Sequence, residues 1–448
     1  MSWVPILQRG HAPIYAAICD AIAGDILAGK LKPGDKMPPH RSLADALGVT
    51  VGTVARAYTE ATKRGLIVGE VGRGTFVTDF DNHREETTQL VVQEQPASEI
   101  IDLGLNLSAT GEAEEMLRVS LRETARLSSI GALLNYQPAG GMSFHRVAAA
   151  KWLNQLGVTT HPDAVVITNG GQHGVLMSFM AVASHGECIA TEHLTYPGAK
   201  AIAHQLGIHL APLAMDRFGL EPDALRELCL IRRPRALYCM PMLHNPTTLS
   251  MSAERIREIA TIAEEFDLWI IEDDVYGFLA ADRPAPLATV VPDRTIHVTS
   301  TSKSMAAGLR VGFIAAPAKL IHTLHELSCM THWMAPPLMT EIVANWILGG
   351  QAESLVAWHR RQARERQALA HRLLGPHAGA TSGACYHSWL PLPEHWRMTR
   401  LPPLRCAKVC GLSPPMHSRS NATRPRTRCG SASAPRIHQR CSKPLLNG

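Results

Sequence analysis

The feature that most constrains the fold is a regular alternation of short apolar runs and helical stretches across residues 100–394. The apolar runs are rich in β-branched residues and are bounded by polar or glycine-containing segments, which is typical of buried strands. Amphipathic stretches such as Ser252–Phe266 separate them. We therefore expect an α/β fold with a mostly parallel central sheet covered by helices on both faces. The predicted strands are Ala164–Thr168, Cys188–Thr191, His209–Met215, Ala236–Met240, Leu268–Glu272, Thr295–Ser300 and Val311–Ala315.

Polar segments follow several of these strands at the point where each strand ends. Because the carboxyl ends of parallel strands meet at one edge of an open sheet, these segments would share one crevice. Each segment alone could be an ordinary loop, but their succession along the chain favours a common site. The segments are Asn169-Gly170-Gly171-Gln172, His244-Asn245-Pro246-Thr247, Glu272-Asp273-Asp274-Val275-Tyr276 and Ser300-Thr301-Ser302-Lys303-Ser304.

The side chains of this predicted site suit a phosphorylated pyridine aldehyde. Lys303 can form an imine with an aldehyde, and the neighbouring hydroxyls together with Arg310 can bind a phosphate. Asp273 can pair with a protonated pyridine nitrogen, while Tyr276 and Asn245 can donate hydrogen bonds to a phenolate oxygen. The glycines before the helix at residue 171 offer backbone N–H groups to the phosphate.

Residues 1–78 have the outline of a winged helix-turn-helix. The pattern predicts three helices followed by a two-stranded hairpin, at Pro13–Ala28, Arg41–Leu47, Val51–Arg64 and Leu66–Val77. Residues 79–99 are polar with little periodicity, and we interpret them as a linker. Residues 395–448 form a tail without apolar periodicity.

The charge of the chain is unevenly distributed. The formal net charge is +5, but the tail from His395 carries eleven Lys and Arg and no Asp or Glu, so the remaining 394 residues carry 33 basic and 39 acidic side chains. The positive total therefore does not indicate a DNA-binding surface. No apolar run is long enough for a transmembrane helix, no secretory signal is apparent, and the cysteines before the tail lie in apolar stretches, so we expect a cytoplasmic protein without a membrane partner.

Residues 100–394 resemble fold type I, pyridoxal-phosphate-dependent aminotransferases, through the four polar segments and Gly308-Leu309-Arg310-Val311-Gly312. Residues 1–78 resemble the GntR winged-helix family, through Gly34-Asp35-Lys36-Met37-Pro38, Gly52-Thr53-Val54 and Gly72-x-Gly74-Thr75-Phe76-Val77. A winged-helix segment followed by an aminotransferase-like segment in one chain resembles the MocR subfamily of bacterial transcriptional regulators.

The resemblance implies a role for each matching residue. Lys303 would bind pyridoxal 5'-phosphate covalently, Asp273 would hold its ring nitrogen, and Asn245 and Tyr276 its ring oxygen. Tyr196 would stack on the ring, and Tyr136 would reach the phosphate across the interface of a homodimer; the alternative for both tyrosines is a packed core position. The residues that would surround the phosphate are Gly171, Gln172, Ser300, Ser302 and Arg310.

For the DNA-binding unit, the resemblance places the helix Val51–Arg64 in the major groove of operator DNA, with the hairpin beside the duplex. The expected contacts are Arg41, Thr50, Thr53, Arg56 and Arg73. The alternative for each arginine is a solvated surface position. The family often has an arginine where this chain has Val51, which leaves the operator sequence open.

The resemblance implies a ligand-responsive transcriptional regulator whose effector is an amino acid, an amine or pyridoxal phosphate itself, acting as a homodimer with a domain-swapped, head-to-tail arrangement as one option. The alternatives are an active aminotransferase and a truncated, inactive product.

The basic tail departs from the family pattern, and we interpret it as out-of-frame translation after a frameshift near codon 400. A DNA-binding extension is a rival interpretation. The cysteines of the tail fit no standard zinc spacing, so we expect no metal site.

Overall fold

The computed structural model separates into two compact units, Met1–Glu94 and Gln95–Gly448, and each is described by itself. None of the described helices is long and apolar enough to cross a lipid bilayer. The structure describes residues 3–5, 13–27, 29–32, 34–63, 66–70, 74–77, 101–102, 106, 108–375, 383–391, 410–411 and 428–429, so the predicted linker at 79–99 lies outside the described residues.

The N-terminal unit is the predicted winged helix. Its elements are α1 (Ile14–Leu27), α2 (His40–Leu47), α3 (Val51–Lys63), β1 (Ile67–Glu70) and β2 (Gly74–Val77). The strands β1 and β2 pair antiparallel, with Ile67 opposite Val77. The isoleucines of α1 recur every four residues, which gives the helix one apolar face. Two of them, Ile18 and Ile22, are fully buried in a cluster with Leu43, Val54 and Ala57.

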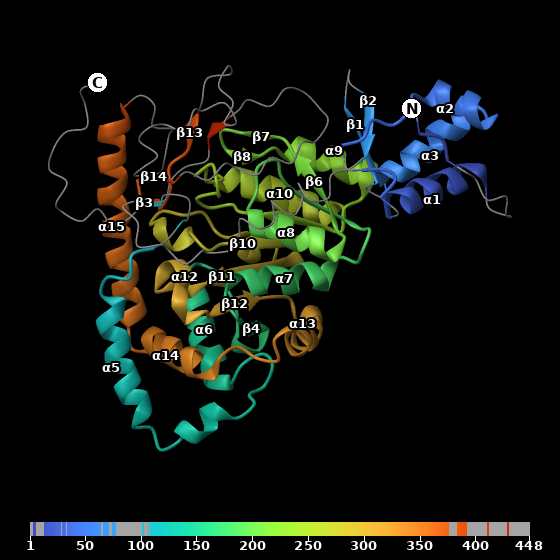
Figure 1. The fold of residues 1–448 in the computed structure, drawn as a ribbon. Helices are drawn as coiled ribbons and strands as arrows, with labels where there is room; N and C mark the ends of the chain where they lie inside the picture. Colours follow the sequence, from blue (N-terminus) through green and yellow to red (C-terminus); the bar gives the residue numbers. More distant parts are fainter. Residues whose placement is uncertain are drawn as a thin grey trace. The chain divides into compact units, whose positions relative to one another are not determined.

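The large unit contains a seven-stranded sheet with the order β4-β12-β11-β10-β9-β5-β6 (Figure 1). Neighbouring strands are parallel except β12, which runs antiparallel to β11 and to β4, so the predicted mostly parallel sheet is confirmed. The strands are β4 (Val165–Thr168), β5 (Cys188–Glu192), β6 (His209–Leu213), β9 (Ala236–Cys239), β10 (Trp269–Asp273), β11 (Thr295–Ser300) and β12 (Gly312–Ala315).

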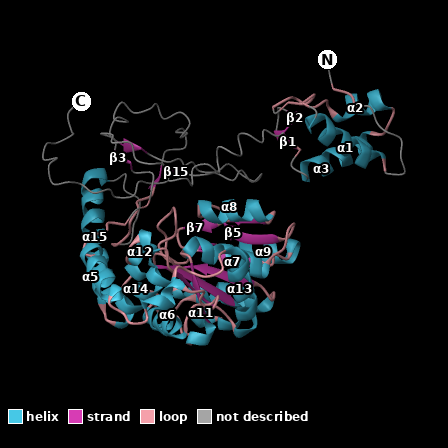
Figure 2. Ribbon diagram, turned by 60° about the horizontal axis from the view of Figure 1, so that its bottom comes forward, coloured by secondary structure: helices cyan, strands magenta, loops and turns pink. Residues whose placement is uncertain are grey.

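Helices cover both faces of this sheet and build two apolar clusters (Figure 2). One face carries α7 (Gly171–Val182), and the other carries α9 (Pro222–Arg232) and α10 (Ala253–Glu265). The remaining helices are α5 (Ala113–Ala125), α6 (Ser143–Gln155), α8 (Pro197–Leu206), α11 (Leu287–Val290), α12 (Thr301–Ser304), α13 (Ala318–Thr331), α14 (Pro337–Leu348) and α15 (Gln351–Leu374), with 3-10 turns at Ile130–Leu134, Pro162–Ala164, Gly277–Leu279, Pro292–Arg294 and Ala307–Leu309.

The predicted strand His209–Met215 ends earlier than expected. β6 stops at Leu213, and Met215–Asp216 (β7) instead pairs with Gly219–Leu220 (β8) in a small hairpin. The turn is closed locally, because the Asp216 carboxylate accepts a hydrogen bond from the Phe218 backbone N–H at 2.7 Å and Gly219 has a φ of 101°.

Two short pairings join the basic tail to the large unit. Ile101–Asp102 (β3) pairs parallel with Cys410–Gly411 (β14), and Leu390–Pro391 (β13) pairs antiparallel with Arg428–Cys429 (β15). Each ladder is two residues long, far below the usual strand length of about five to six residues.

Candidate functional site

The register of three strands brings the phosphate-binding candidates together. Ser300, the last residue of β11, lies opposite Gly312 of β12, and Gly312 lies opposite Thr168, the last residue of β4. The segments next to these positions carry Ser302, at the start of α12, Arg310, just before β12, and Gly170, after β4. Because β12 alone is antiparallel, the loop before it, rather than the loop after it, reaches the carboxyl edge of the parallel strands.

Arg310 is fixed in this corner by its own backbone and by its neighbours. Its φ of 53° is left-handed, and its guanidinium donates to the Ser302 hydroxyl at 3.3 Å and to the Asn169 main-chain oxygen at 3.4 Å. Gly170 has a φ of 81°, and a Cβ atom there would lie 2.6 Å from Arg310 Nη2. The N-terminus of α7 begins at the next residue, so free backbone N–H groups and a guanidinium share one corner, as an anion requires.

Lys303 lies on α12, directly after β11. Its Nζ donates a hydrogen bond to the main-chain oxygen of Asn106 and is 6.0 Å from the centre of the Tyr276 ring. Burial, with a smaller contribution from the charge of Arg310, lowers the pKa of Lys303 to about 8. A substantial neutral fraction near neutral pH makes this amine a nucleophile.

Asp273 ends β10 and is 3% exposed. Its Oδ2 accepts a hydrogen bond from the Tyr238 hydroxyl at 2.6 Å, whereas Oδ1 has no hydrogen-bond partner among the described residues. Burial raises the pKa of Asp273 to about 6, against the opposing effect of the Tyr238 hydrogen bond. A buried, unpartnered carboxylate oxygen is costly unless a ligand donor satisfies it, and a protonated ring nitrogen is such a donor.

Tyr276 is buried, and its hydroxyl accepts a hydrogen bond from Asn106 Nδ2 at 2.7 Å. The same amide nitrogen lies 3.3 Å from His387 Nδ1. Because the Tyr276 oxygen already accepts from Asn106, its own proton is available to a ligand oxygen. Asn245, in the loop after β9, is partly buried.

The two other tyrosines differ in their surroundings. The Tyr196 hydroxyl donates a hydrogen bond to Gln172 Oε1 at 2.8 Å. The Tyr196 ring packs against the main apolar cluster, so this residue belongs to the edge of the core and also contacts a residue of the candidate site. Tyr136 is 79% exposed, and its ring centre lies 5.3 Å from that of Trp333. Tyr136 is therefore not a core residue of the single chain.

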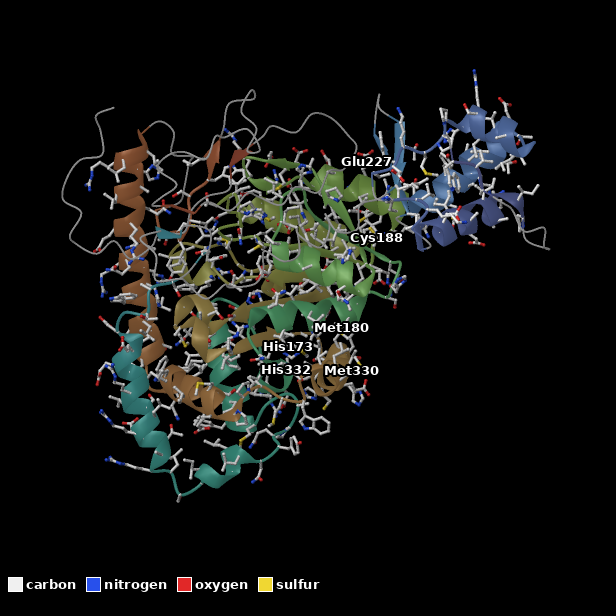
Figure 3. All side chains as sticks on the ribbon, viewed as in Figure 1. His173, Met180, Cys188, Glu227, Met330 and His332 are labelled. Atoms are coloured by element: carbon white, nitrogen blue, oxygen red, sulfur yellow. The ribbon has the colours of Figure 1, made fainter. Side chains whose placement is uncertain are left out.

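The loop that precedes α7 is held from the other side by two histidines, labelled in Figure 3. The Asn169 backbone N–H donates to His173 Nδ1 at 3.1 Å, and His173 Nε2 contacts the Thr331 hydroxyl at 2.8 Å. Burial lowers the pKa of His173 to about 4, so it stays neutral and Nδ1 can accept. His332 contacts the Asn169 side chain, so α13 anchors the loop.

Sequence reasoning missed several residues that the fold brings to this site. Tyr238, Asn106 and His387 contact Asp273 or Tyr276, and the Tyr386 hydroxyl donates to the Lys303 main-chain oxygen at 2.9 Å. Asn106 and His387 are 281 residues apart in the chain, so no local pattern links them. The hydroxyl of Tyr238 in the otherwise apolar strand β9 was the one available signal.

In the N-terminal unit, Arg41 and Thr50 are exposed, as a DNA contact requires. Thr50 also caps the start of α3, because its hydroxyl accepts a hydrogen bond from the Thr53 backbone N–H at 3.2 Å. The Arg56 guanidinium lies 4.2 Å from the ring centre of Tyr15, so it has a packing role as well. Arg73 lies outside the described residues.

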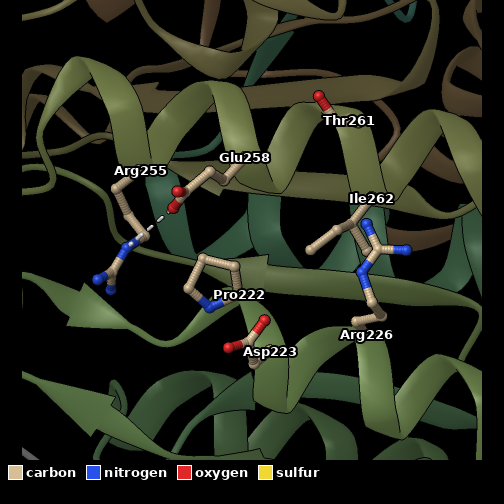
Figure 4. Close-up of a pocket in the computed structure, with 7 residues that line it drawn as sticks. All are labelled: Pro222, Asp223, Arg226, Arg255, Glu258, Thr261 and Ile262. Atoms are coloured by element: carbon tan, nitrogen blue, oxygen red, sulfur yellow. Dashed lines mark ion pairs between the residues drawn. The ribbon is translucent and has the colours of Figure 1, made fainter.

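A separate cavity of about 400 Å³ lies between α9 and α10 (Figure 4). Its two arginines already have acidic partners: Arg226 pairs with Glu265, and Arg255 pairs with Asp216 at 2.8 Å. Neither helix contributes a residue to the carboxyl edge around Lys303, so this cavity is not part of the predicted site.

Comparison with known proteins gives two family matches. Residues 98–395 match the model described as aminotransferase class I and II, and residues 14–77 match bacterial regulatory proteins, gntR family. The first match ends where the acid-free tail begins.

Individual relatives match over most of this chain. The uncharacterized HTH-type transcriptional regulator YdeF of Bacillus subtilis is 30% identical over 88% of this chain and 84% of its own length. The HTH-type pyridoxine biosynthesis transcriptional regulator PdxR of Corynebacterium glutamicum is 26% identical over 83% and 82%. Among solved structures, Pyrococcus horikoshii kynurenine aminotransferase in complex with PMP is similar with a TM-score of 0.70, 19% identity, and coverage of 79% of this chain and 90% of that chain, which supports the fold.

Proposed function

Because this chain belongs to the aminotransferase class I and II family and carries a gntR-type N-terminal domain, as MocR-type regulators do, we propose that it is a DNA-binding transcriptional regulator that binds pyridoxal 5'-phosphate and responds to a small amine or amino acid, or to the cofactor itself. The observation that carries the cofactor proposal is the presence, at one sheet edge, of the Lys303 amine and of a buried Asp273 Oδ1 that has no hydrogen-bond partner among the described residues. The winged helix carries the DNA-binding proposal.

The described residues fit each part of the cofactor. The residues that would hold the phosphate are Arg310, Ser300, Ser302, Gln172 and Gly171 at the N-terminus of α7. Asp273 Oδ1 would accept the ring N–H, and Tyr276 and Asn245 would donate to the ring oxygen. Tyr196 would cover the ring face.

When bound, the cofactor supplies an aldehyde for Lys303 and an electron-withdrawing ring. Lys303 would be the amine that holds this aldehyde, and an amine effector would compete with it. A change in the amine that holds the aldehyde would alter the contact between Lys303 Nζ and the Asn106 oxygen. Such a local change in charge and contacts can bias a two-state domain arrangement and thereby alter DNA binding.

The proposal includes a homodimer. Tyr136 is exposed beside Trp333, other large side chains are exposed on the same unit, and the partner's phosphate is the ligand that we assign to the Tyr136 hydroxyl. The exposed set consists of Leu134 (87%), Tyr136 (79%), Met330 (67%) and Trp333 (54%). The residues that we assign to operator contact are Arg41, Thr50, Thr53, Arg56 and Arg73, the last of which lies outside the described residues.

Two measurements test the proposal. Borohydride reduction of the protein with pyridoxal phosphate, followed by peptide mapping, is expected to place the pyridoxyl group on Lys303; a colourless, unlabelled protein would refute the cofactor assignment. Footprinting of the DNA upstream of the gene, with and without candidate amines, is expected to show protection that changes with the effector. If the DNA is protected neither with nor without the amines, the assignment as a DNA-binding regulator would be refuted.

A working aminotransferase is the second candidate. It is supported by the depressed pKa of Lys303, which suits a base that moves a proton at the substrate α-carbon. A bovine kynurenine/alpha-aminoadipate aminotransferase is 29% identical over half of this chain and 60% of its own length. Steady turnover of an amino acid with an oxo-acid supports this candidate, and a single half-reaction without turnover supports the regulator. A protein with neither activity would be the truncated product.

A further inference from the structure

Tyr238 lies within β9 and is fully buried. Its register partner on β10 is Ile271, two residues before Asp273. Because strand side chains alternate between faces, Ile271 and Asp273 project from the same face of the sheet as Tyr238. Phe179 of α7 packs edge-on against the Tyr238 ring, with ring centres 5.6 Å apart. The tyrosine is therefore held between α7 and the aspartate.

The hydrogen bond makes the two oxygens of Asp273 unequal. Oδ2 accepts the Tyr238 proton at 2.6 Å, and Oδ1 has no partner among the described residues. Burial and the negative charge of Asp273 raise the pKa of Tyr238 well above its ordinary value, so the hydroxyl remains a donor. A carboxylate held at one oxygen keeps a single orientation, which presents the other oxygen in a fixed direction.

We propose that Tyr238 is a positioning residue for the cofactor site. Its hydroxyl holds the Asp273 carboxylate in its charged form, with Oδ1 directed to the ring nitrogen. The proposal rests on the pyridoxal phosphate site described above and extends it to a residue that touches neither cofactor nor effector. Its action is entirely through Asp273.

The charges around Asp273 determine how this effect depends on pH. Burial raises the pKa of Asp273 to about 6, the Tyr238 hydrogen bond and His297 lower it, and Asp274 raises it. Removal of the hydroxyl should therefore raise the pKa further, so that more of the Asp273 is protonated near neutral pH and unable to pair with a ring N–H as an anion. The other titratable groups that interact with Asp273 are Glu192, Tyr196, Cys239 and Tyr276.

The experiment measures the affinity of wild-type protein and Tyr238→Phe for pyridoxamine 5'-phosphate by calorimetry at two pH values. This probe has the ring nitrogen and phosphate but no aldehyde, so it does not bind Lys303 covalently. At pH 8.5 we expect an affinity loss of roughly 10-fold, the usual effect of one hydrogen bond to a charged group. At pH 6.5 the loss should be several-fold larger, because more Asp273 is protonated in the variant.

The matched control is Tyr58→Phe. This buried tyrosine of the N-terminal unit donates its hydroxyl to the Pro38 main-chain oxygen at 2.8 Å, so the same atom is removed without contact to Asp273. Its affinity for the probe should equal that of the wild type at both pH values. At each pH we compare the affinity of the variant with that of the wild-type protein as a ratio. Lys303 ionisation affects both proteins equally, so its contribution cancels in this ratio.

An equal loss at both pH values, or no loss, would overturn the proposal and reduce Tyr238 to a packing role. A wild-type protein that binds no probe would instead refute the proposed function. If Tyr238→Phe does not fold, 3-fluorotyrosine at position 238 provides the second variant. The hydroxyl of 3-fluorotyrosine is a stronger hydrogen-bond donor. The affinity of this variant for pyridoxamine 5'-phosphate should therefore fall less between pH 8.5 and pH 6.5 than the affinity of the wild-type protein falls. An unchanged pH dependence would contradict the proposal.

Discussion

Lys303 is the residue whose ionisation most directly controls the proposed chemistry. The lowered pKa of about 8 means that the neutral, nucleophilic fraction rises as pH rises and levels off above that value. We expect the rate of covalent attachment of pyridoxal phosphate to increase about 10-fold per pH unit below the pKa. Stopped-flow absorbance across this range measures the rate. Lys303→Ala should give no reducible adduct, and a labelled peptide elsewhere would contradict the assignment.

Gly170 tests the phosphate corner. Gly170→Ala would place a Cβ atom 2.6 Å from Arg310 Nη2 and force alanine into a φ of 81° with a ψ of 171°, a region essentially restricted to glycine, so we expect weaker binding of pyridoxal phosphate and a stability loss of about 1–3 kcal/mol. Gly186→Ala is the matched control, because Gly186 has a similar φ of 84° with nothing within 4 Å of its Cβ position. The Gly186→Ala variant should keep the wild-type affinity for pyridoxal phosphate. Equal affinity in both variants would remove Gly170 from the site.

Within α3 and its neighbours, two arginines separate DNA contact from packing. Arg41→Ala should weaken operator binding and leave the stability of the protein unchanged. The slope of the logarithm of the binding constant against the logarithm of the salt concentration should become shallower by the amount expected for about one phosphate contact. Arg56→Ala should also lower the unfolding free energy by about 0.5–1 kcal/mol, because the guanidinium stacks on Tyr15. Fluorescence anisotropy at several salt concentrations and urea unfolding measure the two effects. Normal DNA binding by Arg41→Ala would exclude that contact.

The strands and helices show where element prediction succeeds and where it stops. β11 has the predicted bounds, because Thr295–Ser300 is rich in β-branched residues and is bounded by a proline-containing turn and a serine-rich helix start. The predicted strand at His209–Met215 was too long, because the turn at Asp216–Gly219 recruits Met215 into a separate hairpin. Local apolar character located the strand, whereas the competing turn decided its end.

For the whole molecule, Tyr136 tests the proposed dimer. Tyr136→Ala should shift the monomer–dimer equilibrium toward monomer and weaken cofactor binding in parallel, since the hydroxyl is assigned to the partner's phosphate. Sedimentation equilibrium and calorimetry measure the two effects. Leu230→Ala is the control, because Leu230 is 67% exposed on α9, a helix not assigned to the interface. Unchanged cofactor binding in Tyr136→Ala would contradict the assignment of its hydroxyl to the partner's phosphate, and an unchanged monomer–dimer equilibrium would remove Tyr136 from the interface.

The tail is the other feature that belongs to the whole molecule. We expect resequencing of the locus to show a one-base shift near codon 400, because residues 395–448 contain no acidic residue and the aminotransferase match stops at residue 395. An intact reading frame that encodes this tail would overturn the interpretation.

The sequence by itself determined the strand positions, the winged helix and the succession of Lys303, Asp273, Tyr276 and Arg310, because periodicity and turn residues are local signals. The tertiary structure alone decided the strand order, the antiparallel placement of β12 and the contacts that Tyr238, Asn106 and His387 make. It also set the pKa values of Lys303 and Asp273, since burial arises only when segments far apart in the chain pack together.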